Sequence, residues 1–326
     1  MKKILFLFVT GFLLQSCGQD STITKANKEI DQNLRTSIAQ KNDSLLNALS
    51  DSNNKALLNL ASPEFKEDMY RKLDEVLWPF RKGELETKSV VFDEFHNVHK
   101  KFPNNSTIRS DDHGYNFTFT NNHSETYISL LKCTQNTTDD FLVTVIYARF
   151  GNDFKIIHTD IGELGLYGKT AQDYFKIAKQ QDEKGYLIDA YNNADAADDF
   201  KEPSGKMLVY DNIDELPDYV KTLRANLKAK VKFPQTLQSL ETVPMVINIA
   251  PAKNATEISN MIFYISQVPI KDTTGIRREF AGIKAELKKA YPLNFDKRYM
   301  YYRVFNGKPA SLNDAAFFAF TDINKK

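Results

Sequence analysis

Apolar residues near the start of the chain recur at three- and four-residue steps, the spacing of one helical face. This pattern predicts a helix over residues 43–61. Ser62 and Pro63 then predict the start of a second helix, with Ser62 as the N-cap and Pro63 in the first turn. The second helix carries Phe65, Met69, Leu73, Val76, Leu77 and Phe80 and is expected to end near Gly83. Apolar residues are sparse over residues 17–40, which we interpret as a tether.

From Lys88 onward the apolar period changes to two, which is typical of strands with one buried face. Five strands are predicted, over Ser89–Phe102, Tyr115–Phe119, Thr126–Cys133, Phe141–Phe150 and Phe154–Ile161. Gly151-Asn152-Asp153 is the clearest hairpin turn between them. Two helices followed by an antiparallel meander predict an α+β fold, with helices on a bent antiparallel sheet.

Helical spacing returns after Gly165 and predicts a helical hairpin with a break at Gly185. Pro203-Ser204-Gly205 is the predicted domain boundary. A second small α+β domain follows, with the order α-β-β-α-β-β. The predicted organisation is a signal peptide (1–16), a lipidated tether (17–40), an α+β domain (41–162), the helical hairpin (163–203) and a C-terminal α+β domain (204–326).

The first residues combine a positive start, Met1-Lys2-Lys3, with an apolar run over Ile4–Leu14. Eleven residues are too few to span a bilayer, which needs about 20, so this segment is interpreted as a signal peptide. Leu14-Gln15-Ser16-Cys17 resembles the lipobox of bacterial lipoproteins, including those of Bacteroidota. The resemblance implies that Cys17 is acylated and becomes the mature N-terminus, and that the lipid bilayer is a partner. Gly18 in place of Asp implies the cell outer membrane, with its periplasmic or surface face left open.

Charge and cysteine content narrow the classes of function. Removing residues 1–16 takes Lys2 and Lys3 from the 43 basic residues and leaves 41, against 42 acidic residues. A chain so close to neutral offers no strong field for nucleic acid, so no nucleic-acid partner is expected. Cys133 is the second of two cysteines. If Cys17 carries lipid, Cys133 has no partner within the chain, and its apolar surroundings predict a buried thiol.

The order of elements over residues 43–161 resembles the nuclear-transport-factor-two-like (cystatin-like) cone, in which helices pack into the concave side of a bent sheet. His158 and Asp160 are the candidate catalytic residues, because alternate residues from Phe154 to Asp160 were expected to share one strand face. In enzymes with the cone fold such pairs transfer protons within the cavity. The alternative is that both side chains lie on a solvated rim.

No metal site and no cofactor are expected. His96 and His99 are three residues apart in a predicted strand and therefore point to opposite faces. The sequence contains no Gly-x-Ser-x-Gly elbow, no glycine-rich phosphate loop and no Cys-x-x-Cys pair.

Three functions stay open. The leading one is a membrane-anchored envelope lipoprotein that is not an enzyme. It binds a small apolar ligand or an envelope partner protein through the cone-shaped first domain, and the second domain is a further interaction module. The second is a cone-fold isomerase or hydrolase that uses His158 and Asp160. The third is an envelope assembly or chaperone accessory protein that docks through the helix pair at residues 170–200.

Overall fold

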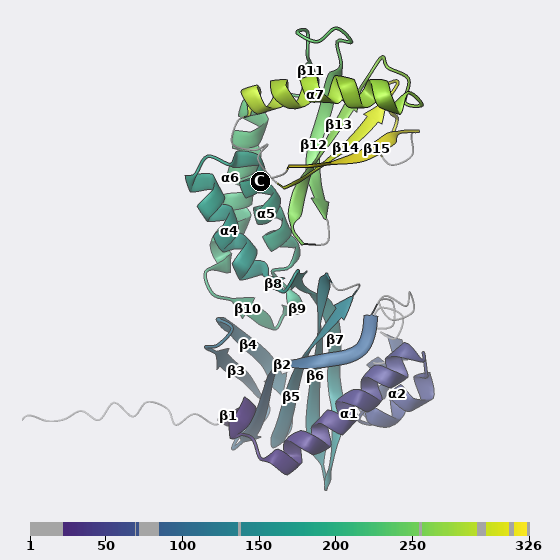
Figure 1. Cartoon of the computed structure of the whole chain (residues 1–326). Coiled ribbons are helices and arrows are strands. Elements are labelled where there is room, and N and C mark those ends of the chain that lie inside the picture. Colours follow the sequence, from purple (N-terminus) through teal and green to yellow (C-terminus); the bar gives the residue numbers. More distant parts are fainter. Residues whose placement is uncertain are drawn as a thin grey trace, which may run out of the picture.

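The computed structural model describes residues 22–68, 70–71, 85–135, 138–253, 256–291, 298–312 and 316–324. Cys17, the predicted signal peptide and most of the second predicted helix lie outside these residues. Ser62 does lie within them, and its hydroxyl accepts the backbone N–H of Phe65, as an N-cap does. The fold is α+β, as predicted (Figure 1). No helix among the described residues is long and apolar enough to span a membrane.

A curled antiparallel sheet of six strands forms the centre of the N-terminal unit, in the order β1-β2-β5-β6-β7-β8. Its strands are β1 (Thr22–Ala26), β2 (Leu85–His99), β5 (Glu125–Gln135), β6 (Asp139–Phe150), β7 (Asp153–Leu166) and β8 (Lys169–Thr170). The predicted hairpin at residues 151–153 is confirmed: Gly151, at φ +61°, lies in the turn between β6 and β7. A left-handed backbone at this position favours glycine, which has no Cβ to clash.

Two helices cover one face of this sheet, α1 (Gln32–Ser50) and α2 (Asn54–Leu60). The single helix predicted over 43–61 is therefore two helices, with a break at Ser52, where φ is +51°. Asp31 begins α1 by accepting the backbone N–H groups of the second and third residues that follow it.

The predicted tether over 17–40 is wrong for residues 22–40. β1 pairs with β2 along its whole length, and α1 follows it. Ile30 and Ile38 are 3% and 0% exposed. Isolated apolar residues at four-residue steps are enough for a helix that packs on a sheet, because the sheet supplies the rest of the apolar surface.

A second sheet of three strands, in the order β10-β4-β3, covers the other face. Its strands are β3 (Asn104–Ser110), β4 (Tyr115–Asn121) and β10 (Leu208–Tyr210). Alternate residues of β3 from Ser106 to Ser110 are buried.

The predicted boundary at residues 203–205 is also wrong, because the chain returns there to the N-terminal unit. β9 (Pro203–Lys206) crosses over β7, and β10 then pairs with β4. At the crossing, a Cβ on Gly162 would lie 2.4 Å from the carbonyl oxygen of Pro203, so only glycine fits there. Composition at these three residues does not show which unit the chain joins afterwards.

The predicted helical hairpin is confirmed as α4 (Ala171–Glu183) and α5 (Leu187–Asp199), with Gly185 between them at φ +82°. After the short 3-10 helix η2 (Ile213–Glu215), α6 (Leu216–Lys230) packs against α5 as a third helix. These helices lie between the N-terminal unit and the C-terminal sheet (Figure 1).

The C-terminal sheet has the order β11-β12-β13-β14-β15. Its strands are β11 (Gln235–Thr236), β12 (Met245–Lys253), β13 (Ile258–Ile265), β14 (Tyr299–Phe305) and β15 (Phe318–Ile323). α7 (Thr273–Ala290) connects β13 to the parallel strand β14 and covers one face of the sheet. Its buried residues Ile276, Ile283 and Leu287 pack with Tyr264 and Tyr302 of the sheet. The expected second small sheet covered on one side is present.

Candidate functional site

His158 and Asp160, the catalytic candidates from sequence, lie on β7 but not on the face that was expected. A β-bulge at Ile157 adds one residue to β7: Tyr147 of β6 is opposite Ile156, and the preceding residue, Ile146, is opposite His158. Ile156 therefore faces α1 and α2, as Tyr147 does, whereas His158 and Asp160 point to the opposite face. Strict alternation from sequence could not anticipate the extra residue.

The interior on the helix-covered side of the sheet is filled. Leu45, Leu46 and Leu49 of α1 are fully buried there, against Tyr127 and Tyr147. Aromatic and leucine side chains thus occupy the space in which a cone-fold enzyme would hold its substrate. The proton-transfer hypothesis placed His158 in this interior, and the bulge removes it from there.

His158 and Asp160 instead line a cavity of about 600 Å³ between β7, β4 and β9, here called the sheet groove. Its polar lining residues include Asn105, Thr118, Thr120, Ser204 and Lys206. The Asp160 carboxylate accepts the backbone N–H of Ile161 at 2.9 Å. Ser204 is buried and accepts a 2.9 Å hydrogen bond from the Thr144 hydroxyl, which ties β9 to β6.

The other histidines do not converge on one point. His99 is buried between the hydroxyls of Thr22, at 2.9 Å, and Thr126, at 3.0 Å, and burial lowers its pKa. His113 stacks on Phe92 with a ring-centre distance of 4.0 Å. His123 lies 3.3 Å from a carboxylate oxygen of Glu64. Within the described ranges, no group of three His, Cys, Asp or Glu side chains is arranged to hold a metal ion.

His96 belongs to a charged cluster with Glu125 and Arg149. The Glu125 carboxylate lies 2.8 Å from His96 Nε2 and 2.5 Å from Arg149 Nε. Burial alone raises the pKa of Glu125, but the hydrogen bonds from Arg149 and His96 outweigh it and hold that pKa below its usual value. This cluster joins β2, β5 and β6 at one end of the sheet.

Two adjacent buried carboxylates, Asp93 and Glu94 on β2, are the polar feature that sequence reasoning missed. Asp93 is 1% exposed and accepts hydrogen bonds from Tyr115 (2.6 Å), Ser110 (2.8 Å) and Asn27 (2.9 Å). Burial and the neighbouring Asp93 charge raise the pKa of Tyr115 far above its ordinary value. Tyr115 is therefore a permanent donor to this carboxylate.

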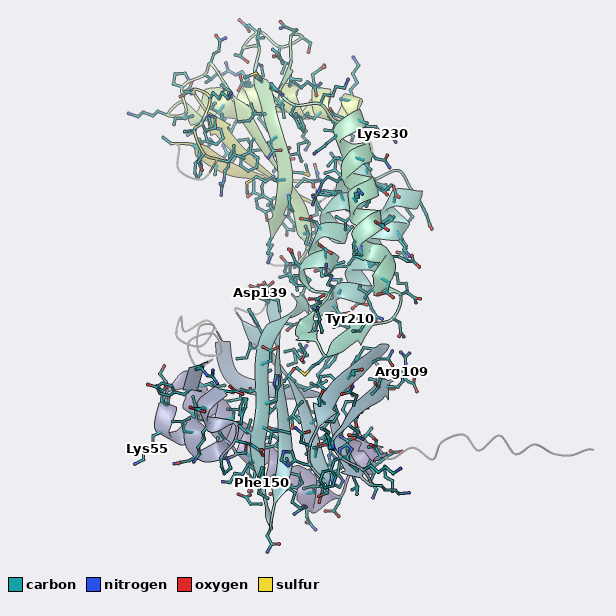
Figure 2. The ribbon with its side chains drawn as sticks, turned by 180° about the vertical axis from the view of Figure 1, so that it is seen from behind. Lys55, Arg109, Asp139, Phe150, Tyr210 and Lys230 are labelled. Atoms are coloured by element: carbon teal, nitrogen blue, oxygen red, sulfur yellow. The ribbon has the colours of Figure 1, made fainter. Side chains whose placement is uncertain are left out.

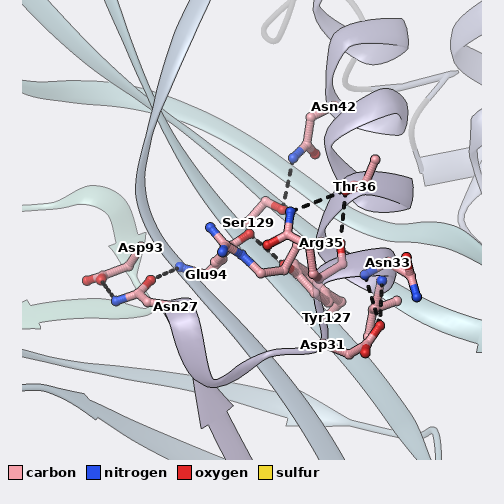
Figure 3. Close-up of polar contacts among 12 residues, drawn as sticks. Asn27, Asp31, Asn33, Arg35, Thr36, Asn42, Asp93, Glu94, Tyr127 and Ser129 are labelled. Carbon is pink, nitrogen blue, oxygen red and sulfur yellow. Dashed lines mark hydrogen bonds and ion pairs between the residues drawn. The ribbon is translucent and has the colours of Figure 1, made fainter.

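Glu94 is held differently from Asp93. It accepts hydrogen bonds from Arg35 of α1 and, at 2.5 Å, from Tyr127. Figure 3 shows the Asn27 side chain between the two acidic residues: it donates to Asp93 and accepts the backbone N–H of Glu94 at 3.0 Å. The hydrogen bonds of Asn27 and Arg35 to these two acidic residues fix the segment between β1 and α1 on the sheet. This is a structural role.

A second cavity, of about 350 Å³, lies between α5, α6 and β12, and we call it the α5–β12 groove. Eight of its twelve lining residues are apolar or aromatic: Ile188, Tyr191, Leu227, Val231, Phe233, Ile249, Ala250 and Pro251. The four others, Asn192, Asp195, Lys228 and Asn248, supply polar groups.

Buried hydrogen bonds fix the two walls of the α5–β12 groove relative to each other. Asn192 of α5 donates to Asn260 of β13 at 2.7 Å, and Asn260 donates to Asp189 at 2.9 Å. At the rim, Arg224 of α6 donates to the Tyr191 hydroxyl at 3.1 Å. A groove whose walls are cross-linked in this way is preformed, as small-molecule sites usually are.

Cys133 is fully buried on β5, as its apolar neighbours predicted. Burial raises the pKa of its thiol to about 12, so the reactive thiolate is scarce at neutral pH.

Comparisons with protein-family models, with curated proteins and with solved structures gave no match. The function has therefore to be argued from the two grooves and the sequence itself.

Proposed function

We propose that this chain is an acyl-anchored lipoprotein of a bacterial cell envelope, and that its folded part binds a small apolar ligand in the α5–β12 groove. The groove is the observation that carries the binding proposal. The N-terminal pattern, with its apolar run over Ile4–Leu14 and Cys17 at the expected cleavage point, carries the anchoring proposal.

Size and lining favour an apolar ligand over a polar one. A cavity of about 350 Å³ is within the range of roughly 300–1,000 Å³ that is typical of small-molecule sites. Its apolar surface comes from both walls, Leu227 and Val231 on α6 and Ile249 on β12. Lys228 and Asn192 add a cation and an amide that can orient one polar end of such a ligand.

Filling the groove tests the binding proposal. Ala250→Phe places a ring in the groove, whereas Ala319→Phe adds the same ring at an exposed position of β15 in the same sheet. The full chain is extracted from membranes in mild detergent and its mass is measured under native conditions. We expect a bound small molecule in the wild type and in Ala319→Phe, and its loss in Ala250→Phe. An equal amount in both variants, or none in the wild type, would refute binding in this groove.

The enzyme hypothesis has one supporting observation, which is that His158 and Asp160 line the same groove. It predicts that His158→Ala abolishes turnover of ester or enone substrates, whereas His113→Ala, outside the sheet groove, leaves turnover unchanged. Equal rates in both variants would remove the hypothesis.

The accessory-protein hypothesis requires an accessible helix pair. Nine of the thirteen residues of α5 are buried, so α4 would have to supply most of the docking surface. Reproducible crosslinks from α4 to one envelope protein would favour this function.

A further inference from the structure

The first described strand lies close in sequence to the proposed lipid anchor. β1 starts at Thr22, which is five residues after Cys17. Five residues of fully extended chain span at most about 18 Å. An acylated Cys17 would therefore hold the start of β1 next to the bilayer surface. The residues around Thr22 would then face the membrane.

Strand register shows which end of the N-terminal unit this is. Thr22 pairs with His99, and Val98 pairs with Glu125 of β5. β5 in turn is antiparallel to β6, so that Thr126 pairs with Ala148, close to Phe150. Figure 2 shows Phe150 at the end of the sheet away from α4, α5 and α6, whereas Asp139, at the other end of β6, lies near these three helices. The anchor thus lies at the end opposite α4, α5, α6 and the C-terminal sheet.

Apolar side chains are exposed at this end of the sheet. Ile23 and Val98 form a cross-strand pair on β1 and β2 and are 53% and 41% exposed. Phe102, in the loop that follows β2, is 51% exposed. This loop is next to Thr22, because the side chain of Asn104 hydrogen-bonds the Thr22 hydroxyl at 3.5 Å. Exposed apolar side chains therefore lie on both faces of the sheet at this end: Ile23 and Val98 on one face, and Phe102 with the loop beside the Thr22 hydroxyl on the other.

The charges beside these residues fit an anionic surface. Lys100 and Lys101 immediately precede Phe102 and are exposed. The ion pairs between described residues include neither of them, whereas acidic groups at this end are paired, Glu125 with Arg149 and Asp153 with Lys41. Lysines at a membrane surface are attracted to anionic lipid head groups, and an aromatic ring beside them suits the interface.

We propose that the loop of Lys100, Lys101 and Phe102, next to the start of β1, lies directly on an anionic phospholipid bilayer. This inference rests on the proposed acylation of Cys17. The N-terminal unit would then stand on the membrane rather than hang from a long tether, with the α5–β12 groove pointing away from the bilayer.

A fluorescent label at position 102 tests the proposal. Cys133 is buried, so a thiol-reactive nitrobenzoxadiazole dye labels the acylated Phe102→Cys variant only at the new cysteine. Ile323→Cys is the matched control: Ile323 is 56% exposed, and it lies on β15 of the C-terminal unit. Both proteins are inserted into vesicles of phosphatidylethanolamine and phosphatidylglycerol, and flotation separately measures how much protein is bound.

The expected result is that the dye at position 102 shifts to the blue and is quenched by brominated lipid, while the dye at position 323 stays in water. If the chain floats with the vesicles but both dyes report water, the docking surface is wrong and the anchor stands. If the acylated and the Cys17→Ser chains float equally, anchoring itself fails.

A second variant checks the surface without replacing Phe102. Lys100→Glu with Lys101→Glu is expected to lower the vesicle partitioning of the Cys17→Ser chain by at least roughly tenfold at low salt. Unchanged partitioning would contradict a role for these lysines.

Discussion

Two of the helix-on-sheet interfaces of this protein differ in whether they leave room for a ligand. Under α1, leucine and tyrosine side chains fill the space above the six-stranded sheet. Between α5, α6 and β12, the side chains leave a cavity of about 350 Å³, with Ala250 in its wall. The helix-covered side of the six-stranded sheet is therefore a structural core, whereas the α5–β12 groove leaves room for a ligand.

Two leucine substitutions give the largest expected contrast between these interfaces. Leu46 is 0% exposed under α1, whereas Leu227 is only partly buried at the α5–β12 groove. Leu46→Ala is expected to lower the free energy of unfolding by about 3 kcal/mol, and Leu227→Ala by less than about 1.5 kcal/mol, because a groove wall leaves no sealed void. Urea unfolding of the Cys17→Ser chain measures both. Similar losses would mean that the groove is packed as tightly as the core.

Removing the charge of Asp93 is expected to have the next largest effect. Asp93→Asn keeps the size of the side chain but replaces an acceptor that serves three donors, Tyr115, Ser110 and Asn27. The expected loss of unfolding free energy is about 2 kcal/mol, the usual size for buried hydrogen bonds to a charged group. Asp111→Asn, at an exposed turn residue, is the control and should change little. Equal effects would show that the buried network does not stabilise the fold.

The Glu125 cluster predicts a smaller, pH-dependent effect. The pKa of Glu125 is lower in the folded chain than the ordinary value of 4.5. As pH falls, Glu125 is therefore protonated first in the unfolded chain. Its contribution to the free energy of unfolding is present above pH 4.5 and is lost as pH falls through the folded pKa. The stability advantage of the wild type over Glu125→Gln should therefore shrink as pH falls from 7 toward 3. A difference that does not change with pH would contradict the paired carboxylate.

Periodic patterns predicted most of the fold. The sequence predicted the helical hairpin, the 151–153 turn and the C-terminal order of elements. Each of these depends on contacts between residues that are close together in the sequence. The errors came from contacts between distant residues. The segment at 22–40 is ordered only because the sheet covers Ile30 and Ile38, and β9 and β10 return to the first unit only because Gly162 lets the chain cross β7.

The site was harder to predict than the fold for the same reason. His158 and Asp160 do line one groove, but the bulge at Ile157 turns them to the other face of the sheet. The α5–β12 groove brings together α5, α6 and β12, which follow no shared pattern in the sequence. Asp93 and Glu94 looked like ordinary strand residues, and only their partners on β4, β5 and α1 make them distinctive.

The anchor at Cys17 is the claim on which the rest of the account depends, and the mass of the mature chain tests it most directly. Protein extracted from bacterial membranes should begin at Cys17 and carry the mass of three acyl chains, and Cys17→Ser should lose this added mass. A mature chain that begins elsewhere or carries no lipid would contradict it.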